Sequence, residues 1–273
     1  MRVRIIFSLK NRGAKIHFHH QHLLAKFAQN IISKCDPKYR DFKFYNFSGL
    51  KGQIKVGKGG LHYLSSKVTL VFSSLNIEFL NQFLNTLFSF KQLYIGEMEL
   101  SPDSIEMEAD INFDNKNKYV CISPVLIVDP VLYVEENKSF IEPYTDTFSD
   151  FLYESTMLRM EKSGNYSAEQ ISSFNQFQFT PDKEYLLKMQ SEEKKYSRVY
   201  QTYINNEKYE VRGYTLPFTL FAAPDVHNFI FHSGLGALSE NGFGMIDLAN
   251  SDPTQRTIKY NLEKSEIKMI PSA

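Results

Sequence analysis

Four histidines gather in the short segment His17-Phe-His-His-Gln-His22, and Lys26 follows four residues later. An imidazole has an ordinary pKa near neutrality, so it can donate or accept a proton at physiological pH. A lysine beside it can stabilise negative charge that develops during the reaction. These residue types are suited to general acid–base catalysis.

An amphipathic helix at about residues 21–34 must position these side chains. At about 100° per residue, the apolar side chains fall on one broad face and the polar ones form a stripe opposite. The apolar face comprises Leu23, Leu24, Phe27, Ile31 and Ile32, and the stripe comprises His22, Lys26, Gln29 and Ser33. If the helix begins near His19 or His20, His19 joins His22 on the polar face and His20 turns toward the core. We therefore favour His22, then His19, as the acid or base.

A metal site is the alternative use of the same histidines. His19 and His22, three residues apart, can share a zinc ion. No Cys, Asp or Glu lies between His17 and Lys34 to complete a ligand set. We predict no metal and no cofactor, while exposed or capping histidines without a role remain the other alternative.

The segment from Gly234 to Gly244 holds four glycines between apolar runs. Such a backbone adopts positive φ and leaves its N–H groups uncovered by side chains, so it can lie directly against a phosphate. The P-loop motif does not fit because the segment ends Gly242-Phe243-Gly244, and the dinucleotide fingerprint fails at Ser239. A plain glycine-rich hairpin and an unrelated nucleotide-binding loop are the alternatives.

Charge is distributed unevenly although the chain has 31 basic and 31 acidic residues. Residues 1–75 contain 14 Lys and Arg against two Asp, and the remainder contains 17 Lys and Arg against 29 Asp and Glu. This asymmetry indicates a polyanionic partner on the basic side. The segment Lys51–Gly60 contributes Lys51, Lys55 and Lys58, and its glycines predict a mobile basic loop.

Length and composition place the chain in the globular class. Its 273 residues are 42% hydrophobic, enough for one large or two modest domains. No apolar run approaches the roughly 18 residues that span a bilayer, and no signal peptide is evident. We expect a cytoplasmic protein without a membrane partner, and Cys35 and Cys121 as buried small hydrophobes.

The expected elements form two similar halves joined by a polar linker at 110–118. In the first half we predict strands at 2–9, 42–50, 60–73 and 92–108 with helices at 21–34 and 76–90, which is a β-α-β-β-α-β order. In the second half we predict strands at 119–134, 174–190, 196–204, 207–222 and 243–248 with helices at 147–162 and 225–233. The corresponding domains are 1–112 and 119–273.

Several motifs together resemble a known family. The pattern Gly234, Gly236, Gly242-Phe-Gly-Met245 resembles the C-terminal glycine-rich signature of the repeat-associated RNA-binding (RAMP) superfamily of CRISPR systems, and most closely its sixth CRISPR-associated family. The opening strand Arg2–Leu9, the strand Phe44–Leu50 and the turn Ser123-Pro-Val125 follow in the family's order. The resemblance covers almost the whole chain.

The resemblance implies an α+β fold of two tandem ferredoxin-like domains with a C-terminal glycine-rich loop. It also implies a metal-independent endoribonuclease that binds and cleaves CRISPR repeat RNA, the precursor of guide RNA. In that family the 2′-hydroxyl attacks the phosphate, which leaves 2′,3′-cyclic phosphate and 5′-hydroxyl ends. Other CRISPR effector subunits and a homodimer are further partners to consider.

Residue roles follow from the resemblance. The candidate catalytic residues are His22, His19, Lys26 and Lys51, and the candidate RNA-binding residues are Lys55, Lys58, Gly234, Gly236, Gly242, Phe243 and Gly244. The chain departs from the family pattern at two places: Gln29 stands where many members have tyrosine, and residues 35–60 lack histidine. The rival hypothesis is therefore a non-catalytic CRISPR RNA-binding subunit. Tyr39 and Tyr45 are alternative catalytic candidates.

Overall fold

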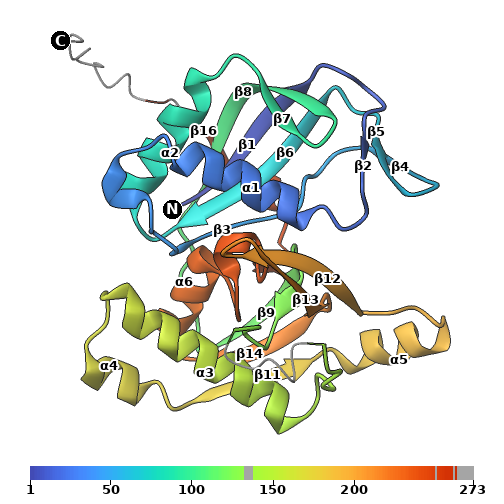
Figure 1. Ribbon diagram of the computed structural model, residues 1–273. Coiled ribbons are helices and arrows are strands. Elements are labelled where there is room, and N and C mark those ends of the chain that lie inside the picture. Colours follow the sequence, from blue (N-terminus) through green and yellow to red (C-terminus); the bar gives the residue numbers. More distant parts are fainter. Residues whose placement is uncertain (132–137, 250, 261, 263–273) are drawn as a thin grey trace.

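Residues 1–131, 138–249, 251–260 and 262 are described by a computed structural model of the chain, shown in Figure 1. Two α+β halves lie one above the other, and the chain passes from the upper to the lower half at about residue 110. The sequence prediction of a mixed α+β fold is confirmed.

The first half is built on a mainly antiparallel sheet. Its elements are β1 (Arg2–Leu9), β2 (Lys15–Ile16), α1 (Gln21–Ile32), η1 (Pro37–Tyr39), β3 (Tyr45–Phe47), β4 (Ile54–Gly57), β5 (Gly60–Tyr63), β6 (Lys67–Ser74), α2 (Ile77–Ser89), β7 (Leu93–Ile95) and β8 (Met98–Glu108). The sheet has the strand order β8-β1-β6-β3, and β7 pairs with β8. Strands β2, β5 and β4 form a separate small sheet.

Helices α1 and α2 cover one face of this sheet because their apolar residues recur at helical spacing. The ring of Phe27 on α1 packs edge-on against Phe7 of β1, with centroids 6.1 Å apart. Helix α2 begins where the Asn76 side chain accepts a hydrogen bond of 2.9 Å from the Phe79 amide, which caps its N-terminus. The apolar face predicted for α1 thus points into the core, with Leu24, Phe27 and Ile31 all buried.

The second half has its own sheet. Its elements are β9 (Lys116–Cys121), β10 (Val125–Leu126), α3 (Asp146–Ser163), α4 (Ala168–Ser173), β11 (Phe177–Pro181), α5 (Lys183–Ser191), β12 (Ser197–Ile204), β13 (Glu207–Tyr214), β14 (Phe218–Ala222), α6 (Pro224–Ser233), η2 (Ser239–Asn241), β15 (Ile246–Leu248), η3 (Pro253–Arg256) and β16 (Thr257–Tyr260). The order β15-β9-β14-β11 repeats the connectivity of the first sheet.

Three predicted elements of the second half differ in the structure. The predicted strand 174–190 is wrong after residue 181, because the Asp182 side chain caps α5 through the Tyr185 amide at 2.9 Å. Strands β12 and β13 form a hairpin in a separate sheet with β10, and β14 alone continues into the main sheet. The predicted strand 119–134 is divided into β9 and β10, and its residues 132–134 lie outside the described part of the chain.

The predicted loop Lys51–Gly60 is also more regular than expected. Strands β4 and β5 pair from Ile54↔Tyr63 to Gly57↔Gly60, so only Lys58 and Gly59 form the turn. Gly59 has φ +86°, which a two-residue hairpin turn favours and which few other residues adopt without strain. The basic segment therefore forms a β-hairpin in the structure.

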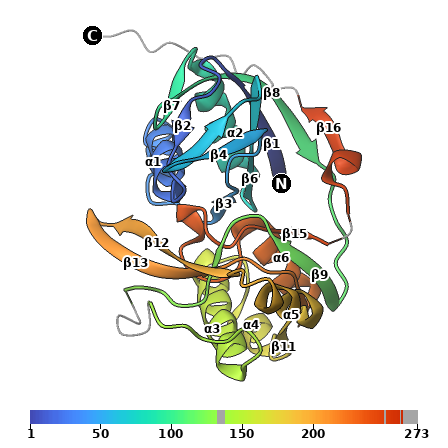
Figure 2. The ribbon, with the colours of Figure 1, turned by 90° about the vertical axis from the view of Figure 1, so that its right-hand side faces the viewer.

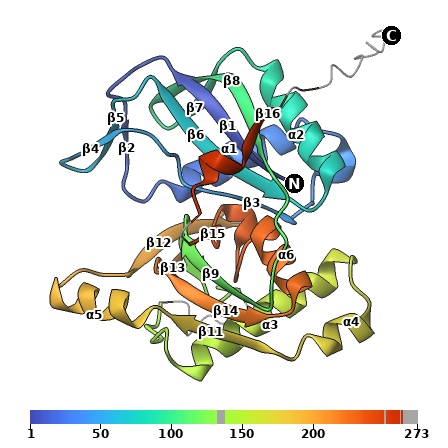
Figure 3. The ribbon, with the colours of Figure 1, turned by 180° about the vertical axis from the view of Figure 1, so that it is seen from behind.

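The second half is joined to the first by the chain that enters it after β8 and by the chain that leaves it before β16. Strand β16 follows the second sheet along the chain, and it pairs with β8 of the first sheet, as Figure 3 shows from behind. The fully buried guanidinium of Arg2 donates to the Ile246 carbonyl at 2.8 Å and lies 3.2 Å from the Glu108 carboxylate. Arg256 pairs with Asp247 at 2.8 Å, which extends this buried ion network.

The glycine-rich segment passes directly between the halves. All four glycines have positive φ, between 75° and 88°, as predicted. A Cβ atom at Gly234 would overlap Asn46 of β3, and one at Gly242 would overlap Gln21 of α1. Residues 234–244 are buried apart from the half-buried Glu240. The glycines thus allow the two halves to approach each other.

Replacing Gly244 with alanine is expected to lower the folding stability by more than the strain of a positive φ alone would. The new Cβ would overlap the Leu235 carbonyl oxygen, whose backbone is held in the loop. The matched control is Gly164→Ala at the end of α3, where φ is +67° and nothing lies within 4 Å of an added Cβ. Conformational strain alone costs about 1 kcal/mol, so chemical denaturation should show a larger decrease in stability for Gly244→Ala. Equal decreases would contradict the steric role.

Candidate functional site

A groove of about 600 Å³ runs between α1 of the first half and the β12–β13 hairpin of the second half. Figure 2 shows the hairpin extending beneath α1. The groove is lined by His22, Leu23, Ala25, Lys26, Gln29, Asn30, Thr202, Tyr203 and Asn206. No acidic side chain occurs among these described lining residues, so the groove suits an anionic ligand.

Two of the predicted catalytic histidines meet aromatic residues of β12. The ring centroid of His22 lies 5.9 Å from that of Tyr203, and His19 lies 5.3 Å from Tyr200 in an edge-on arrangement. Helix α1 begins at Gln21, so His19 precedes it rather than sharing its polar face. The two imidazoles nevertheless face the same strand, and this brings both to one side of the molecule.

Burial lowers the pKa of two histidines in the cluster, His20 and His22. Desolvation lowers the pKa of His22, and the nearby His17 acts in the same direction, while the backbone of His19 opposes both. The half-buried His20 also has a lowered pKa, because of burial. Its Nδ1 lies 2.8 Å from the His17 carbonyl, which closes the turn before α1. His22 is consequently neutral at neutral pH and able to accept a proton.

Lys26 is exposed on α1 and lines the groove one turn after His22. Its ammonium can therefore approach a phosphate bound beside the imidazole. The structure thus brings together three of the predicted catalytic residues, His22, His19 and Lys26, along one edge of the interface between the halves.

Lys51 lies elsewhere. It pairs with Thr69 in β6, which in turn pairs with Ile6 in β1. Directly opposed residues project to the same face of a sheet, and this face is opposite to the one that α1 covers. Burial lowers the pKa of Lys51, and Arg4 adds to that effect. The structure therefore separates Lys51 from the histidine groove, which corrects the grouping made from the sequence.

The predicted RNA-binding lysines lie on the small hairpin. Lys55 on β4 and Lys58 in the following turn are both exposed. The hairpin projects from the same side of the first half as the beginning of α1, as Figure 1 shows. Strand β2 joins these two features, because it pairs with β5 and leads into the segment before α1. A basic surface thus adjoins the groove.

The glycine-rich segment does not present its backbone to solvent. The Gly244 amide donates to the Pro124 carbonyl at 2.7 Å, and the Gly242 amide donates to the Ser239 carbonyl at 2.8 Å. Phe243 is 1% exposed. The expectation that these N–H groups are uncovered is therefore wrong, and the segment has no free surface on which Gly234, Gly236, Gly242, Phe243 or Gly244 could contact a phosphate.

The same segment instead positions the walls of the groove. The Gln21 side chain, at the first position of α1, donates to the Gly242 carbonyl. Phe243 packs edge-on against Tyr200 at 5.9 Å, and Asn241 donates to the Thr202 hydroxyl at 3.3 Å. Both α1 and β12 are thus fixed to one loop.

Sequence reasoning missed two contributions to this site. Arg159 of α3 donates to the carbonyls of Gly234 at 2.7 Å and Gly236 at 3.1 Å, and it also bonds Ser233. Burial lowers the pKa of Arg159 to about 10, so it remains charged at neutral pH. Tyr203 and Asn206 enter through the β12–β13 turn, where Asn205 and Asn206 both have positive φ. That Asn-Asn pair is a recognisable signal for a tight hairpin.

The described ranges contain no candidate metal site and no candidate membrane-spanning helix. No group of three or more His, Cys, Asp or Glu side chains is arranged to hold a metal ion there. No helix of the described chain combines the length and the apolar character needed to cross a membrane.

Comparison with known proteins supplies independent information. The family model "CRISPR associated protein Cas6, C-terminal" matches residues 105–248. A search of curated proteins found no match. A solved structure described as "CRISPR associated protein Cas6" has a TM-score of 0.71 and 21% identity, with 92% of this chain and 99% of that chain covered.

Two further solved structures have similar folds. One, described as a Cas6-related gene from Pyrococcus furiosus, has a TM-score of 0.73 and 16% identity, and the match covers 92% of this chain and 99% of that chain. Another, described as an RAMP protein binding different RNA substrates, has a TM-score of 0.72 and 17% identity, with 92% and 100% covered. At these identities the likeness concerns the fold.

Proposed function

Because the chain belongs to the Cas6 family, we propose that it is a metal-independent endoribonuclease that binds CRISPR repeat RNA and cuts it to produce guide RNA. The observation that carries this proposal is the groove in which His22 and Lys26 of one half face Tyr203 of the other. We also propose that the halves are ferredoxin-like domains, which the repeated strand order supports.

The proposed reaction starts at the 2′-hydroxyl beside the scissile phosphate. Neutral His22 removes the hydroxyl proton, and the 2′-oxygen attacks phosphorus. The bond to the 5′-oxygen breaks as that oxygen receives a proton, for which the exposed His19 is the proposed donor. Lys26 stabilises the charge on the phosphorane oxygens. The products are a 2′,3′-cyclic phosphate and a 5′-hydroxyl.

The RNA backbone is proposed to follow the basic hairpin before it enters the groove. Lys55 and Lys58 are exposed there and belong to the region of the chain with a large excess of basic residues. Electrostatic attraction of this kind contributes affinity without sequence selectivity. Association with other CRISPR effector subunits or with a second copy of the chain is compatible with this path.

A non-catalytic RNA-binding subunit is the second candidate function. It is favoured by Gln29 in the groove and by the lack of histidine in residues 35–60. The two functions differ in one assay. Repeat transcript incubated with the protein in EDTA yields two fragments if the protein is the enzyme, and bound but intact RNA if it is the binding subunit.

Replacing His22 with alanine is expected to slow single-turnover cleavage by about 10²- to 10⁴-fold, the usual contribution of a general acid or base. Repeat affinity should change only a few fold, since a neutral imidazole attracts phosphate weakly. The matched control is His17→Ala, an exposed histidine of the same segment that does not line the groove. Cleavage at the wild-type rate by His22→Ala and by the His19→Ala/His22→Ala double variant would exclude the histidine mechanism.

The cleavage rate of the wild-type protein should stay high in mildly acidic solution. His22 must be neutral to accept a proton, and burial lowers its pKa below the ordinary 6.5. Its neutral form therefore persists to lower pH than that of a free histidine. The rate measured with subsaturating RNA should decline on the acid side with a midpoint below pH 6.5. A midpoint above that value would assign the titration to another group.

The variant Lys55→Ala/Lys58→Ala should bind repeat RNA more weakly and with a smaller dependence on salt. For single-stranded RNA, the slope of log affinity against log salt falls by about 0.7 for each phosphate that is no longer neutralised by a lysine. The control Lys183→Ala/Lys195→Ala removes two exposed lysines from the second half. Equal slopes for wild type and Lys55→Ala/Lys58→Ala would show that the hairpin lysines do not bind the RNA backbone.

A further inference from the structure

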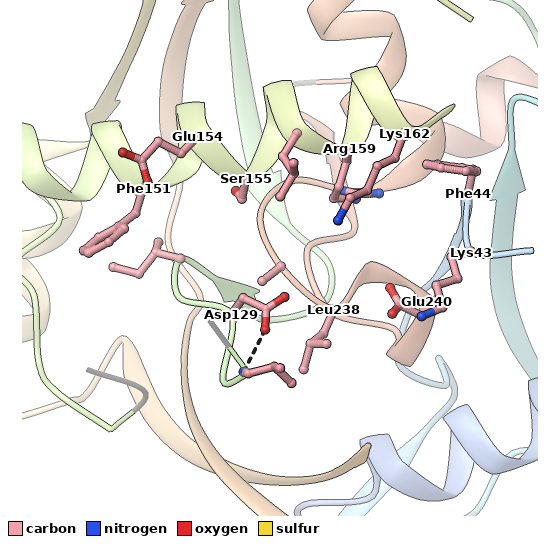
Figure 4. Close-up of a pocket in the computed structure, with 14 residues that line it drawn as sticks. Lys43, Phe44, Asp129, Phe151, Glu154, Ser155, Arg159, Lys162, Leu238 and Glu240 are labelled. Carbon is pink, nitrogen blue, oxygen red and sulfur yellow. Dashed lines mark hydrogen bonds between the residues drawn. The ribbon is translucent and has the colours of Figure 1, made fainter. Parts of the chain in front are cut away.

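A second pocket, of about 330 Å³, opens between the halves and is shown in Figure 4. Helix α3 forms one wall, and the segment before β3 and the 3-10 helix η2 form the other. It is close to the histidine groove along the chain: Glu240 of η2 lines the pocket, and the next residue, Asn241, bonds Thr202 in the groove wall. Nothing in the proposed cleavage chemistry uses this pocket.

The walls of the pocket are mainly apolar, although Asp129, Glu154 and Ser155 also line it. Phe44, Leu158 and Leu238 line it from three different elements. Leu158 is 36% exposed on α3 and marks the open rim, whereas Leu238 is 8% exposed and lies deeper. Apolar side chains of this kind suit the faces of a planar aromatic ligand.

The deep wall is held rigidly. Leu238 has φ +53°, a left-handed conformation that a non-glycine residue seldom adopts. Arg159, which also lines the pocket, fixes the preceding turn by its bonds to the Gly234 and Gly236 carbonyls. Strained residues of this type are often found at ligand-binding sites, where the surrounding structure maintains them.

Charged groups lie both beside the deep wall and at the open rim of the pocket. The half-buried carboxylate of Glu240 faces the cavity beside Leu238, and Lys43 and Lys162 extend from opposite sides. Both lysines are exposed. A carboxylate accepts hydrogen bonds from the donors of a nucleobase, and lysines at the mouth attract phosphates.

We infer that this pocket holds one unpaired guanine base of the bound RNA. This inference rests on the proposed RNA-binding function. The pocket is within the size range of small-ligand sites, which begins at about 300 Å³. Guanine is favoured because its Watson–Crick edge places two donors, N1–H and the N2 amino group, side by side, and the Glu240 carboxylate can accept from both. Single-stranded RNA is commonly read in this way.

The test compares two short RNA probes by fluorescence anisotropy. Each probe is a run of adenosines with either guanosine or inosine at its centre, and inosine lacks the N2 amino group. Wild-type protein should bind the guanosine probe about tenfold more tightly, because inosine cannot make one of the two hydrogen bonds to the carboxylate. Glu240→Gln should lose this preference. Glu161→Gln, an equal charge change on the exposed face of α3, should retain it.

A second variant fills the pocket without altering its carboxylate. Leu158→Trp, at the exposed rim, should also abolish the preference for guanosine. Equal binding of the two probes by wild type, or a preference that survives in Glu240→Gln and Leu158→Trp, would overturn the inference. Repeat cleavage measured in parallel separates the two proposals: cleavage without a guanosine preference removes the pocket assignment alone, whereas no binding of any RNA removes both.

Discussion

The backbone of residues 234–244 passes between two sheets at a distance that leaves no space for side chains at its glycines. Cβ atoms there would overlap Asn46, Gln21 or backbone carbonyls. Asn46 in turn donates to the Phe243 carbonyl at 2.8 Å, and Arg159 satisfies the carbonyls of Gly234 and Gly236. Because these buried carbonyls have partners, the interface can be dry and still be stable. The arrangement of the halves depends on this constraint.

The histidine groove is a consequence of that arrangement, since each half supplies one wall. Gln21 and Thr202 both bond the glycine-rich segment, and their neighbours His22 and Tyr203 face each other across the groove. Positioning by a rigid loop from the other half places the imidazole where burial lowers its pKa. The segment therefore fixes the geometry of the groove, while the proposed contacts with phosphate belong to Lys26 and the basic hairpin.

The two faces of the first sheet pack against different parts of the molecule. One face carries the helices and the groove. On the other, Arg2 and Glu108 form a fully buried pair, and Lys51 lies near the same network. Breaking such a pair is costly because the remaining charge would be buried without a partner. Part of the basic excess of residues 1–75 is therefore used to hold the halves together, and the remainder is the part that the proposed function assigns to RNA.

The sequence by itself determined the mixed α+β fold, the core face of α1 and the positive φ of the glycines, because these follow from residue type and local periodicity. The family followed from the resemblance of its motifs. It could not determine that those glycines are buried, that Lys51 lies on the sheet face away from His22, or that Tyr203 meets His22. The error at 174–190 has a local cause, since Asp182 ends one element and caps the next. The other differences were decided by strand pairing and by the packing of one half on the other, because these bring together residues that are far apart in the chain.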